Sequence, residues 1–207
     1  MIVPHFMSYR EIGEKAEEFL CKYHSSQKLP IPIERIIEFD LGLDIVPLPN
    51  LYTDFRINGF LSSDCSAIYI DERQYSLYPE KYRFTLAHEV GHLILHGDCY
   101  AEIRWENLSE YIECILSRDR ETLDRLEVQG NLFAEQVLVP ERELFRVIIE
   151  CIGEHAKELA EIGASSRVAL PYISKFISKH FEVNPSVIEC RINHVEDWFS
   201  NLEYWSK

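Results

Sequence analysis

The segment from Glu80 to His96 constrains the fold of this chain more than any other part of it. Its apolar residues would lie on every side of a helix rather than on one stripe: Phe84, Leu86, Ala87, Val90, Leu93, Ile94 and Leu95. That pattern is typical of a helix that is buried over most of its surface. Pro79 suits the first turn of such a helix, and Gly97 suits the position just after its last turn. We therefore expect a buried helix that ends at Gly97.

Three ionisable side chains interrupt this apolar segment in the pattern His-Glu-x-x-His. His88 and His92 are four residues apart, so on a helix they lie one turn apart on the same face and can bind one metal ion. Glu89 lies about 100° around the helix from His88, where it can contact a water molecule at an open zinc position. The pattern predicts a catalytic zinc site with His88 and His92 as ligands and Glu89 as the general base.

A purely structural role is the alternative for these residues. Pairs of histidines on helices are common without a metal, but ionisable groups in apolar surroundings are costly unless they are paired or metal-bound. Gly91 lies inside the same helix, where glycine costs about 1 kcal/mol relative to alanine. A second element packed closely against the backbone at Gly91 would explain that choice. Both features favour the metal site.

The remaining ligand should come from another segment. His96 continues the ladder of histidines, but it lies about 12 Å along the helix axis from His88, so the two cannot readily share one ion. We interpret His96 as a residue at the helix end that supports a ligand. Glu127 and Asn131 lie four apart on one face of a later helix, where a carboxylate could complete a His₂Glu site and an amide could orient an imidazole. Taken alone, a glutamate in an amphipathic helix is usually a solvated residue, so the assignment of Glu127 depends on the residues around it.

The first part of the chain combines two helices with short strands. Ser8 and Glu11 form a capping-box pattern that predicts an amphipathic helix over residues 9–23. A second, short helix should follow Pro32 and end near Gly42. The runs 43–48, 55–61 and 67–70 are rich in β-branched and aromatic residues and are separated by turn residues, so we expect a small antiparallel sheet.

Helix dominates the second half. The patterns predict acidic, helix-prone sequence over 101–120, a helix that stops at Pro140, and helices over 141–162, 172–181 and after Asn184. The predicted fold is α+β: a mainly helical metallopeptidase domain, its small sheet packed on the His-Glu-x-x-His helix, with a short C-terminal helical segment. We expect the boundary between residues 1–166 and 167–207.

Composition excludes several classes of function. The formal net charge of −14 disfavours direct nucleic-acid binding, which depends on Lys and Arg at the phosphate backbone. No run reaches the roughly 18 apolar residues of a membrane span, and no secretory signal is recognisable. The six cysteines form no C-x-x-C pair, so free thiols are expected. We expect a soluble, cytoplasmic protein, and the sequence gives no oligomeric state.

Two blocks of sequence resemble the ImmA/IrrE family of metallo-endopeptidases. They are Arg83-Phe-Thr-Leu-Ala-His-Glu-Val-Gly-His-Leu-Ile-Leu-His96 and Leu126-Glu-Val-Gln-Gly-Asn-Leu-Phe-Ala-Glu-Gln-Val-Leu-Val-Pro140. A weaker third block covers 177–192. The departures from the family pattern are Gly130, where alanine is usual, and Val139, where methionine is usual. The resemblance implies one zinc ion per chain with Glu127 as its third ligand, and site-specific cleavage of a regulatory protein, often a helix-turn-helix repressor.

Other functions keep the same residues. The chain could be a non-catalytic, zinc-containing binding module, an antitoxin or anti-repressor that sequesters a regulator, although an intact Glu89 speaks against it. It could also hydrolyse a bond other than a peptide bond. Tyr82, Tyr100 and Tyr111 are candidates for stabilising the oxyanion, but each could simply pack. The stretch 98–120 could be a lid, a substrate contact or an insertion.

Overall fold

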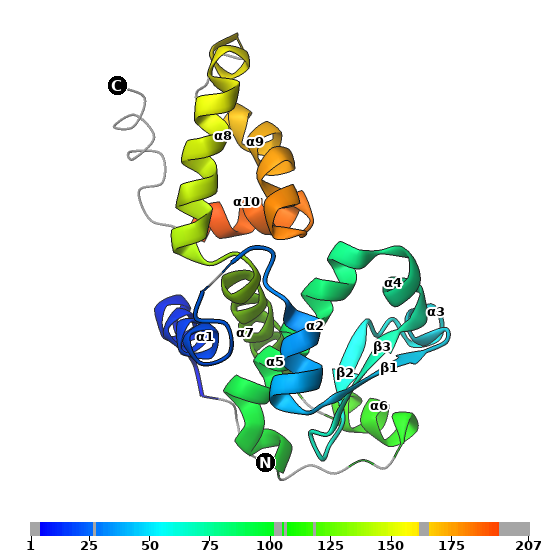
Figure 1. Ribbon diagram of the computed structural model, residues 1–207. Helices are drawn as coiled ribbons and strands as arrows, with labels where there is room; N and C mark the ends of the chain where they lie inside the picture. Colours follow the sequence, from blue (N-terminus) through cyan, green and yellow to red (C-terminus); the bar gives the residue numbers. More distant parts are fainter. Residues whose placement is uncertain are drawn as a thin grey trace.

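The computed structural model describes residues 5–26, 28–101, 105, 107–117, 119–161 and 166–194 (Figure 1). The chain is mainly helical with one small sheet, so the predicted α+β class is confirmed. Its helices are α1 (Tyr9–Tyr23), α2 (Ile33–Arg35), the π-helix η1 (Ile36–Leu41), α3 (Leu51–Phe55), α4 (Glu72–Leu77), α5 (Pro79–Ala101), α6 (Leu108–Leu116), α7 (Arg120–Leu138), α8 (Glu141–Glu161), α9 (Ser166–Phe181) and α10 (Pro185–His194).

The sheet has the order β1-β3-β2, from β1 (Asp44–Leu48), β2 (Gly59–Leu61) and β3 (Ala67–Asp71). β2 pairs with β3 antiparallel, but β1 pairs with β3 parallel, with Ile45 opposite Ile68. The prediction of an antiparallel sheet is therefore wrong for β1. The start of the second predicted strand is helix α3 instead, and β3 inserts between β1 and β2. Since β2 runs opposite to β1, the returning β3 must run parallel to β1.

The N-terminal helices form as the sequence predicts. Ser8 caps α1, and its hydroxyl and the Glu11 carboxylate make the reciprocal bonds of a capping box. The buried side of α1 is a stripe that includes Ile12 and Phe19. The second helix is α2 continued by η1, and it ends at Gly42 in the left-handed conformation at φ 70°. Glycine adopts that conformation without steric cost.

The centre of the molecule is the pair of helices α5 and α7, which pack closely against each other. A Cβ at Gly91 of α5 would lie 3.2 Å from Cβ of Phe133 and 3.3 Å from Cα of Gly130, both on α7. The glycine thus allows the close approach that the sequence suggested. α5 continues through Gly97 to Ala101, so the predicted end at Gly97 is wrong. Gly97 lacks the positive φ that would end the helix.

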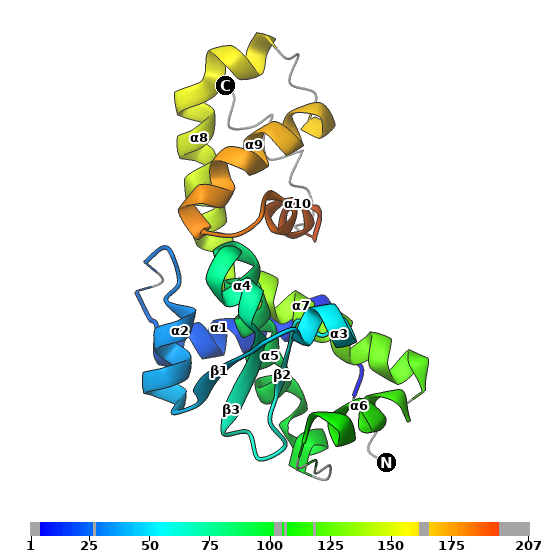
Figure 2. The same ribbon diagram turned by 90° about the vertical axis from the view of Figure 1, so that its right-hand side faces the viewer.

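The other elements surround this pair. The sheet strands β2 and β3 and helix α4 pack on α5, whereas α1 packs on α7. Figures 1 and 2 show α8, α9 and α10 gathered at one end of the molecule, away from the sheet. α9 begins at Ser166 rather than at Tyr172 and contains Pro171. A division of the chain between residues 166 and 167 stays a prediction.

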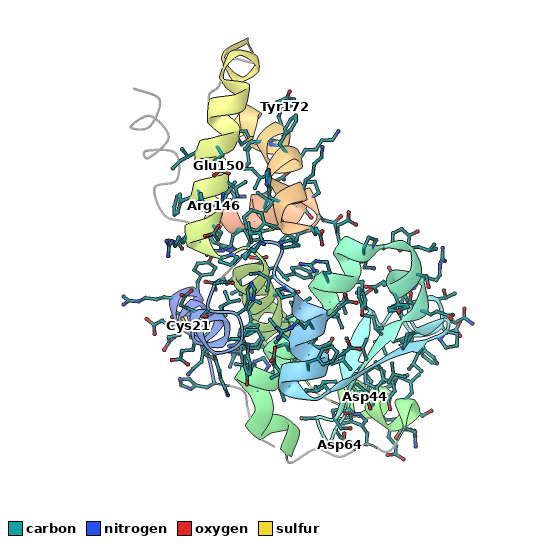
Figure 3. The ribbon with its side chains drawn as sticks, viewed as in Figure 1. Cys21, Asp44, Asp64, Arg146, Glu150 and Tyr172 are labelled. Atoms are coloured by element: carbon teal, nitrogen blue, oxygen red, sulfur yellow. The ribbon has the colours of Figure 1, made fainter. Side chains whose placement is uncertain are left out.

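Two further sequence expectations concern the thiols and membrane-spanning helices. Cysteines with described side chains are free thiols, and Figure 3 labels one of them, Cys21, on the exposed side of α1. Figure 3 also shows Arg146 and Glu150 on α8, where an exposed ion pair of 2.7 Å joins them. In the described part of the chain, no helix is both long enough and apolar enough to span a membrane.

Candidate metal centre

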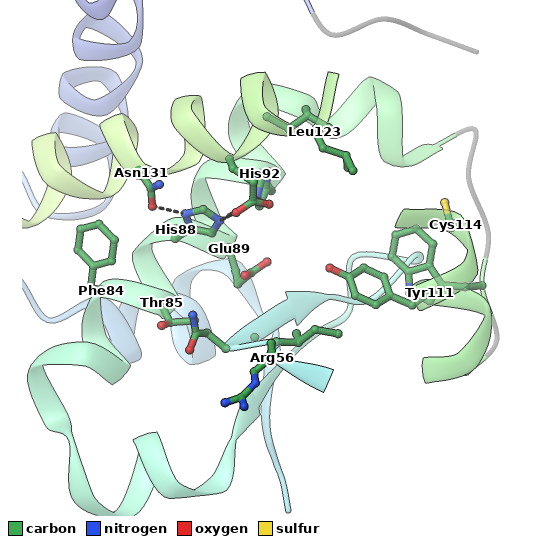
Figure 4. A pocket seen from close by; sticks show the side chains of 16 residues that line it. Arg56, Phe84, Thr85, His88, Glu89, His92, Tyr111, Cys114, Leu123 and Asn131 are labelled. Atoms are coloured by element: carbon green, nitrogen blue, oxygen red, sulfur yellow. Dashed lines mark hydrogen bonds and ion pairs between the residues drawn. The ribbon is translucent and has the colours of Figure 1, made fainter. Parts of the chain in front are cut away.

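Three side chains from α5 and α7 converge at one point. Nε2 of His88 and Nε2 of His92 are 2.9 Å apart. The Glu127 carboxylate on α7 reaches both, with Oε2 3.4 Å from Nε2 of His88 and Oε1 3.7 Å from Nε2 of His92. Figure 4 shows His88 and His92 projecting from α5 toward α7. The structure thus brings the two histidines and the acid of the later block together, from positions about forty residues apart.

The close approach of α5 and α7 sets this geometry. A Cβ built on Gly130 would lie only 2.9 Å from Cε1 of His88, so glycine leaves room for the imidazole. One residue further on, Oδ1 of Asn131 accepts a hydrogen bond of 3.0 Å from Nδ1 of His88. An amide oxygen can only accept, so Nδ1 of His88 carries the proton and Nε2 keeps its lone pair. Asn131 therefore orients His88 toward Glu127.

His96 does not join the convergent group. Its Nδ1 lies 3.0 Å from Nδ1 of His92, on the side of that ring opposite to Glu127. It contacts one candidate ligand from behind and is buried, with 3% of its surface exposed. The supporting role of His96 stays a prediction, and this position beside His92 is where such a residue would lie.

The geometry suits a zinc ion. Ligand atoms at about 2.0–2.1 Å from one tetrahedral zinc lie about 3.3 Å from each other. The three observed separations, 2.9, 3.4 and 3.7 Å, bracket that value. Two imidazole nitrogens facing each other beside a carboxylate are also stabilised when a cation lies among them. Two imidazoles and one carboxylate are a donor set of catalytic zinc sites, so these residues fit the metal.

Burial and neighbouring charges shift the pKa of each group in the cluster. Burial raises the pKa of Glu89 to about 7 and lowers that of His92 to about 4. Burial also works to lower the pKa of His88, but the carboxylates of Glu127 and Glu89, which favour a charged imidazole, outweigh this and raise it. Burial opposes the charged form of Glu127 too, yet the two imidazoles hold the pKa of that carboxyl well below its usual range. Glu127 is therefore an anion that faces two nitrogen ligands.

The cluster lies in an open pocket of about 430 Å³. Glu89 lines the pocket beside the two histidines, and the main chain of Leu61 in β2 works to lower its pKa against the larger effect of burial. Across the pocket, Tyr111 of α6 stacks on Phe60 of β2 with ring centroids 4.4 Å apart. Figure 4 shows the Tyr111 hydroxyl directed into the pocket toward Glu89. The described part of the acidic stretch thus supplies a pocket wall.

The remaining tyrosine candidates differ in position. Tyr82 is 5% exposed and packs edge-on against Tyr75, outside the residues that line the pocket. The side chain of Tyr100 lies outside the described residues. Among the three, Tyr111 is the tyrosine that lines the pocket.

Sequence reasoning missed one residue of this region. Gln129 on α7 is 2% exposed and bonds to His96 through Oε1 at 2.8 Å. A signal for it does exist, because position 129 lies on the stripe of α7 that Leu126 and Phe133 define as buried. A polar residue on the apolar stripe of a helix needs a buried hydrogen-bond partner.

Comparison with known proteins places the chain among peptidases. The model of the IrrE N-terminal-like domain, a peptidase family, matches residues 66–193, which is more than half of the chain. The chain belongs to the ImmA/IrrE family of metallopeptidases. The match spans both sequence blocks that carry the resemblance, and it includes His88, His92 and Glu127.

One ImmA/IrrE relative is the "Radiation response metalloprotease IrrE" of Deinococcus radiodurans, 38% identical over 90 residues. That alignment covers 42% of this chain but only 26% of the relative. A solved structure, a "Mycobacterium tuberculosis transcriptional regulator", has a TM-score of 0.57 at 15% identity and covers 90% of this chain and 47% of that one. At such low identity the second likeness shows the fold alone. The chain spans about a quarter and about half of these two proteins.

Proposed function

We propose that this protein is a zinc-dependent metallo-endopeptidase that cuts a helix-turn-helix transcriptional repressor in the cytoplasm. The observation that carries the proposal is the convergence of His88, His92 and Glu127 with Glu89 beside them in one open pocket. A metal-binding cluster and a titratable carboxylate that share a pocket are what hydrolysis of a peptide bond requires.

His88, His92 and Glu127 would hold one zinc ion per chain, with Asn131 orienting His88. When bound, zinc supplies a Lewis acid that polarises the scissile carbonyl and makes water more acidic. Three protein ligands leave a fourth position open, as catalytic sites do and structural sites do not. The open pocket around the cluster gives a substrate access to that position.

Glu89 would move the proton. Its carboxylate accepts a proton from the attacking water, so that the water oxygen bonds to the carbonyl carbon as the proton leaves. The protonated Glu89 then donates that proton to the amide nitrogen as the C–N bond breaks, which yields a free acid and a free amine. A pKa of about 7 suits a group that must both accept and release a proton near neutral pH.

The strand edge beside the pocket supports an extended polypeptide as the substrate. β2 is an edge strand of the sheet, and its residue Gly59 lines the pocket together with Asn58. The edge of a sheet offers main-chain donors and acceptors that an extended peptide can pair with, and Gly59 brings that edge to the pocket. This supports a peptide bond as the target, over other bonds that the same catalytic residues could hydrolyse.

The family resemblance and the charge support a regulatory protein as substrate. The resemblance implies cleavage of a helix-turn-helix repressor, and such DNA-binding proteins are commonly basic. A chain with a formal net charge of −14 attracts a basic partner over long range. We therefore expect cleavage at one or a few sites of a folded repressor rather than general digestion.

The test compares the parent with Glu89→Gln. Each is incubated with helix-turn-helix repressors of the same genome, beginning with any encoded beside the peptidase gene, and, separately, with denatured casein, and the products are identified by mass spectrometry. The parent should cut the repressor at one or a few bonds. Glu89→Gln should keep its zinc and its fold but lose at least about 10²-fold in rate, the usual range for a lost general base.

Other outcomes distinguish the alternatives. A Glu89→Gln protein that still inactivates the repressor, without cutting it, would favour the binding module. Efficient digestion of casein with the repressor left intact would contradict the regulatory substrate and leave the peptidase activity standing. Undiminished cleavage of the repressor by Glu89→Gln would assign the base to another residue.

A further inference from the structure

A buried row of polar groups runs from the metal centre to the N-terminal segment. Nδ1 of His92 lies 3.0 Å from Nδ1 of His96, and Nε2 of His96 lies 2.8 Å from Oε1 of Gln129. The amide nitrogen of Gln129 donates a bond of 3.0 Å to the main-chain oxygen of His5. Three of these four residues are almost fully buried, with exposed fractions of 4% for His92, 3% for His96 and 2% for Gln129.

The chemistry of the last group gives the row a direction. The carbonyl of His5 can only accept, so the amide nitrogen of Gln129 must face it and Oε1 must face His96. Oε1 also only accepts, so Nε2 of His96 carries a proton and its Nδ1 has a lone pair in the neutral ring. That lone pair accepts from Nδ1–H of His92. His92 then has no proton on Nε2, the nitrogen that faces His88 and Glu127.

We propose that His96 and Gln129 are positioning residues that hold His92 in the tautomer able to bind metal, with the main chain of His5 fixing the direction of the row. The inference rests on the proposed function, because a bare Nε2 serves a metal ion. Burial makes the arrangement strict, since a reversed proton anywhere along the row would leave two buried donors or two buried acceptors facing each other.

The two histidine ligands thus have different support. His88 relies on one group, Asn131, which lies on the same helix as Glu127. His92 relies on the buried row of polar groups, which we call the relay. The relay passes through the imidazole of His96 and ends outside both helices, at His5. Because of this, the segment ahead of α1 contributes to the metal centre although it supplies no ligand to it.

The chain contains a matched control for Gln129. Gln136 lies on the same helix, is 7% exposed, and donates its amide to the main-chain oxygen of Tyr9 at 3.2 Å. Gln129→Met and Gln136→Met therefore remove the same group, from the same helix, and the same kind of bond to the N-terminal part of the chain. In the first variant alone the lost amide also bonded to a histidine of the relay.

The first measurement is the zinc dissociation constant, from competition with a chelator. Gln129→Met should weaken zinc binding by about 10- to 100-fold, the usual effect of losing the partner of a metal-ligating histidine. Gln136→Met should change it by less than about threefold. His96→Leu should behave like Gln129→Met, whereas His96→Asn, whose Oδ1 can take the place of the Nδ1 acceptor, should restore most of the affinity.

The second measurement reads the proton positions directly. In the zinc-loaded parent labelled with ¹⁵N, histidine ring NMR should show His96 as the neutral tautomer protonated at Nε2, and His92 with its proton at Nδ1. A His96 protonated at Nδ1 and bare at Nε2 would overturn the relay without any variant. Equal zinc affinity of Gln129→Met and Gln136→Met would overturn it too. A parent that binds no zinc would instead refute the proposed function itself.

Discussion

Two glutamates of helix α7, Glu127 and Glu135, lie eight residues apart in opposite electrostatic environments. Glu127 faces the two imidazoles of α5, which hold its pKa well below the usual range despite the opposing effect of burial. Glu135 lies at the other end of the helix, and there burial raises its pKa to about 7, although the nearby charge of Arg191 lowers it. The side chain of Glu127 is 61% exposed and that of Glu135 is 10% exposed.

The difference shows that neighbours, rather than residue type or helix, decide what a carboxylate does. Glu127 lines the pocket and lies beside the imidazole nitrogens of His88 and His92, which is an arrangement that suits metal binding. Glu135 is packed at the junction of α7 with α10, where its Oε2 is buried without a hydrogen bond among the described residues and lies 3.4 Å from Nδ1 of His194. The surroundings of Glu127 therefore favour a bound cation, whereas the surroundings of Glu135 make the charged form of its carboxyl unfavourable.

The sharpest test of this comparison removes each carboxylate in turn. Glu127→Ala should weaken zinc binding by more than the roughly 10- to 100-fold that loss of an outer partner costs, because it removes a ligand atom. Glu135→Ala should leave the zinc affinity within about threefold of the parent, since eight residues along the helix place it about 12 Å from Glu127, beyond the distance over which substitutions usually couple. Chelator competition measures both. A zinc affinity that falls equally in the two variants would end the distinction between the regions.

The second test uses pH. The pKa of Glu135 rises from its ordinary 4.5 to about 7 on folding, so between these values the folded chain binds a proton that the unfolded chain has released. Stability from this group is present below about pH 4.5 and is lost as pH rises to about 7. The nearby charge of Arg191 in α10 moderates the shift, and His194 of α10 and Tyr9 of α1 also lie beside this carboxyl.

Glu135→Gln removes that titration. At pH 8 the variant should be more stable than the parent by about 1–3 kcal/mol, a discounted conversion of the pKa shift. At pH 4.5 the two should be nearly equal. Urea unfolding of the zinc-free proteins at both pH values measures the difference in the free energy of unfolding. The histidine cluster titrates in both the parent and the variant, so its contribution cancels when the two are compared at the same pH. A parent that is more stable than the variant at pH 8 would contradict the buried, unfavourable charge.

Local sequence patterns predicted much of this molecule, for a physical reason. Helix spacing alone put His88 and His92 on one face, and the capping box alone started α1 at Tyr9. These features depend on residues a few positions apart. The role of Glu127 came from family resemblance, because an E-x-x-x-N pair on a helix has no unique meaning until the facing helix is known.

What the sequence did not predict depends on contacts between distant segments. The parallel pairing of β1 follows from β3 inserting between two earlier strands, and no local pattern encodes strand order. The role proposed for Gln129 depends on its hydrogen bonds to His96, which lies on another helix, and to the main-chain carbonyl of His5. In the sequence, Gly130 is only a departure from the family pattern, whereas in the structure its missing Cβ leaves space for the ring of His88.

A third test concerns the single hydrogen bond that orients His88, from its Nδ1 to Asn131, in the surroundings of Glu127. Asn131→Leu removes the acceptor for Nδ1 and should weaken zinc binding by about 10-fold, near the lower end for an outer partner. Asn131→Asp keeps an acceptor oxygen and should bind zinc at least as well as the parent. Equal loss in both variants would indicate that the amide contributes shape rather than a hydrogen bond.

The smallest expected effect lies between the two glutamates, at Gly130. A Cβ there would meet Cε1 of His88 at 2.9 Å, so Gly130→Ala must displace the ring by a few tenths of an ångström. Overpacking of this kind costs about 1 kcal/mol, while alanine in a helix gains up to about 1 kcal/mol over glycine. The stability of the zinc-free protein should therefore change little, and the displacement should be visible at the metal instead.

Cobalt in place of zinc gives the readout for that displacement, because its visible absorption reports the ligand geometry. Gly130→Ala should shift the cobalt spectrum and weaken metal binding by less than Asn131→Leu does. Gly97→Ala is the control, since no described atom lies within 4 Å of its built Cβ and it sits on the same helix as His88. That variant should leave the spectrum unchanged and raise the stability by up to about 1 kcal/mol. An unchanged spectrum in Gly130→Ala would show that the ring of His88 has more freedom than its contact with α7 suggests.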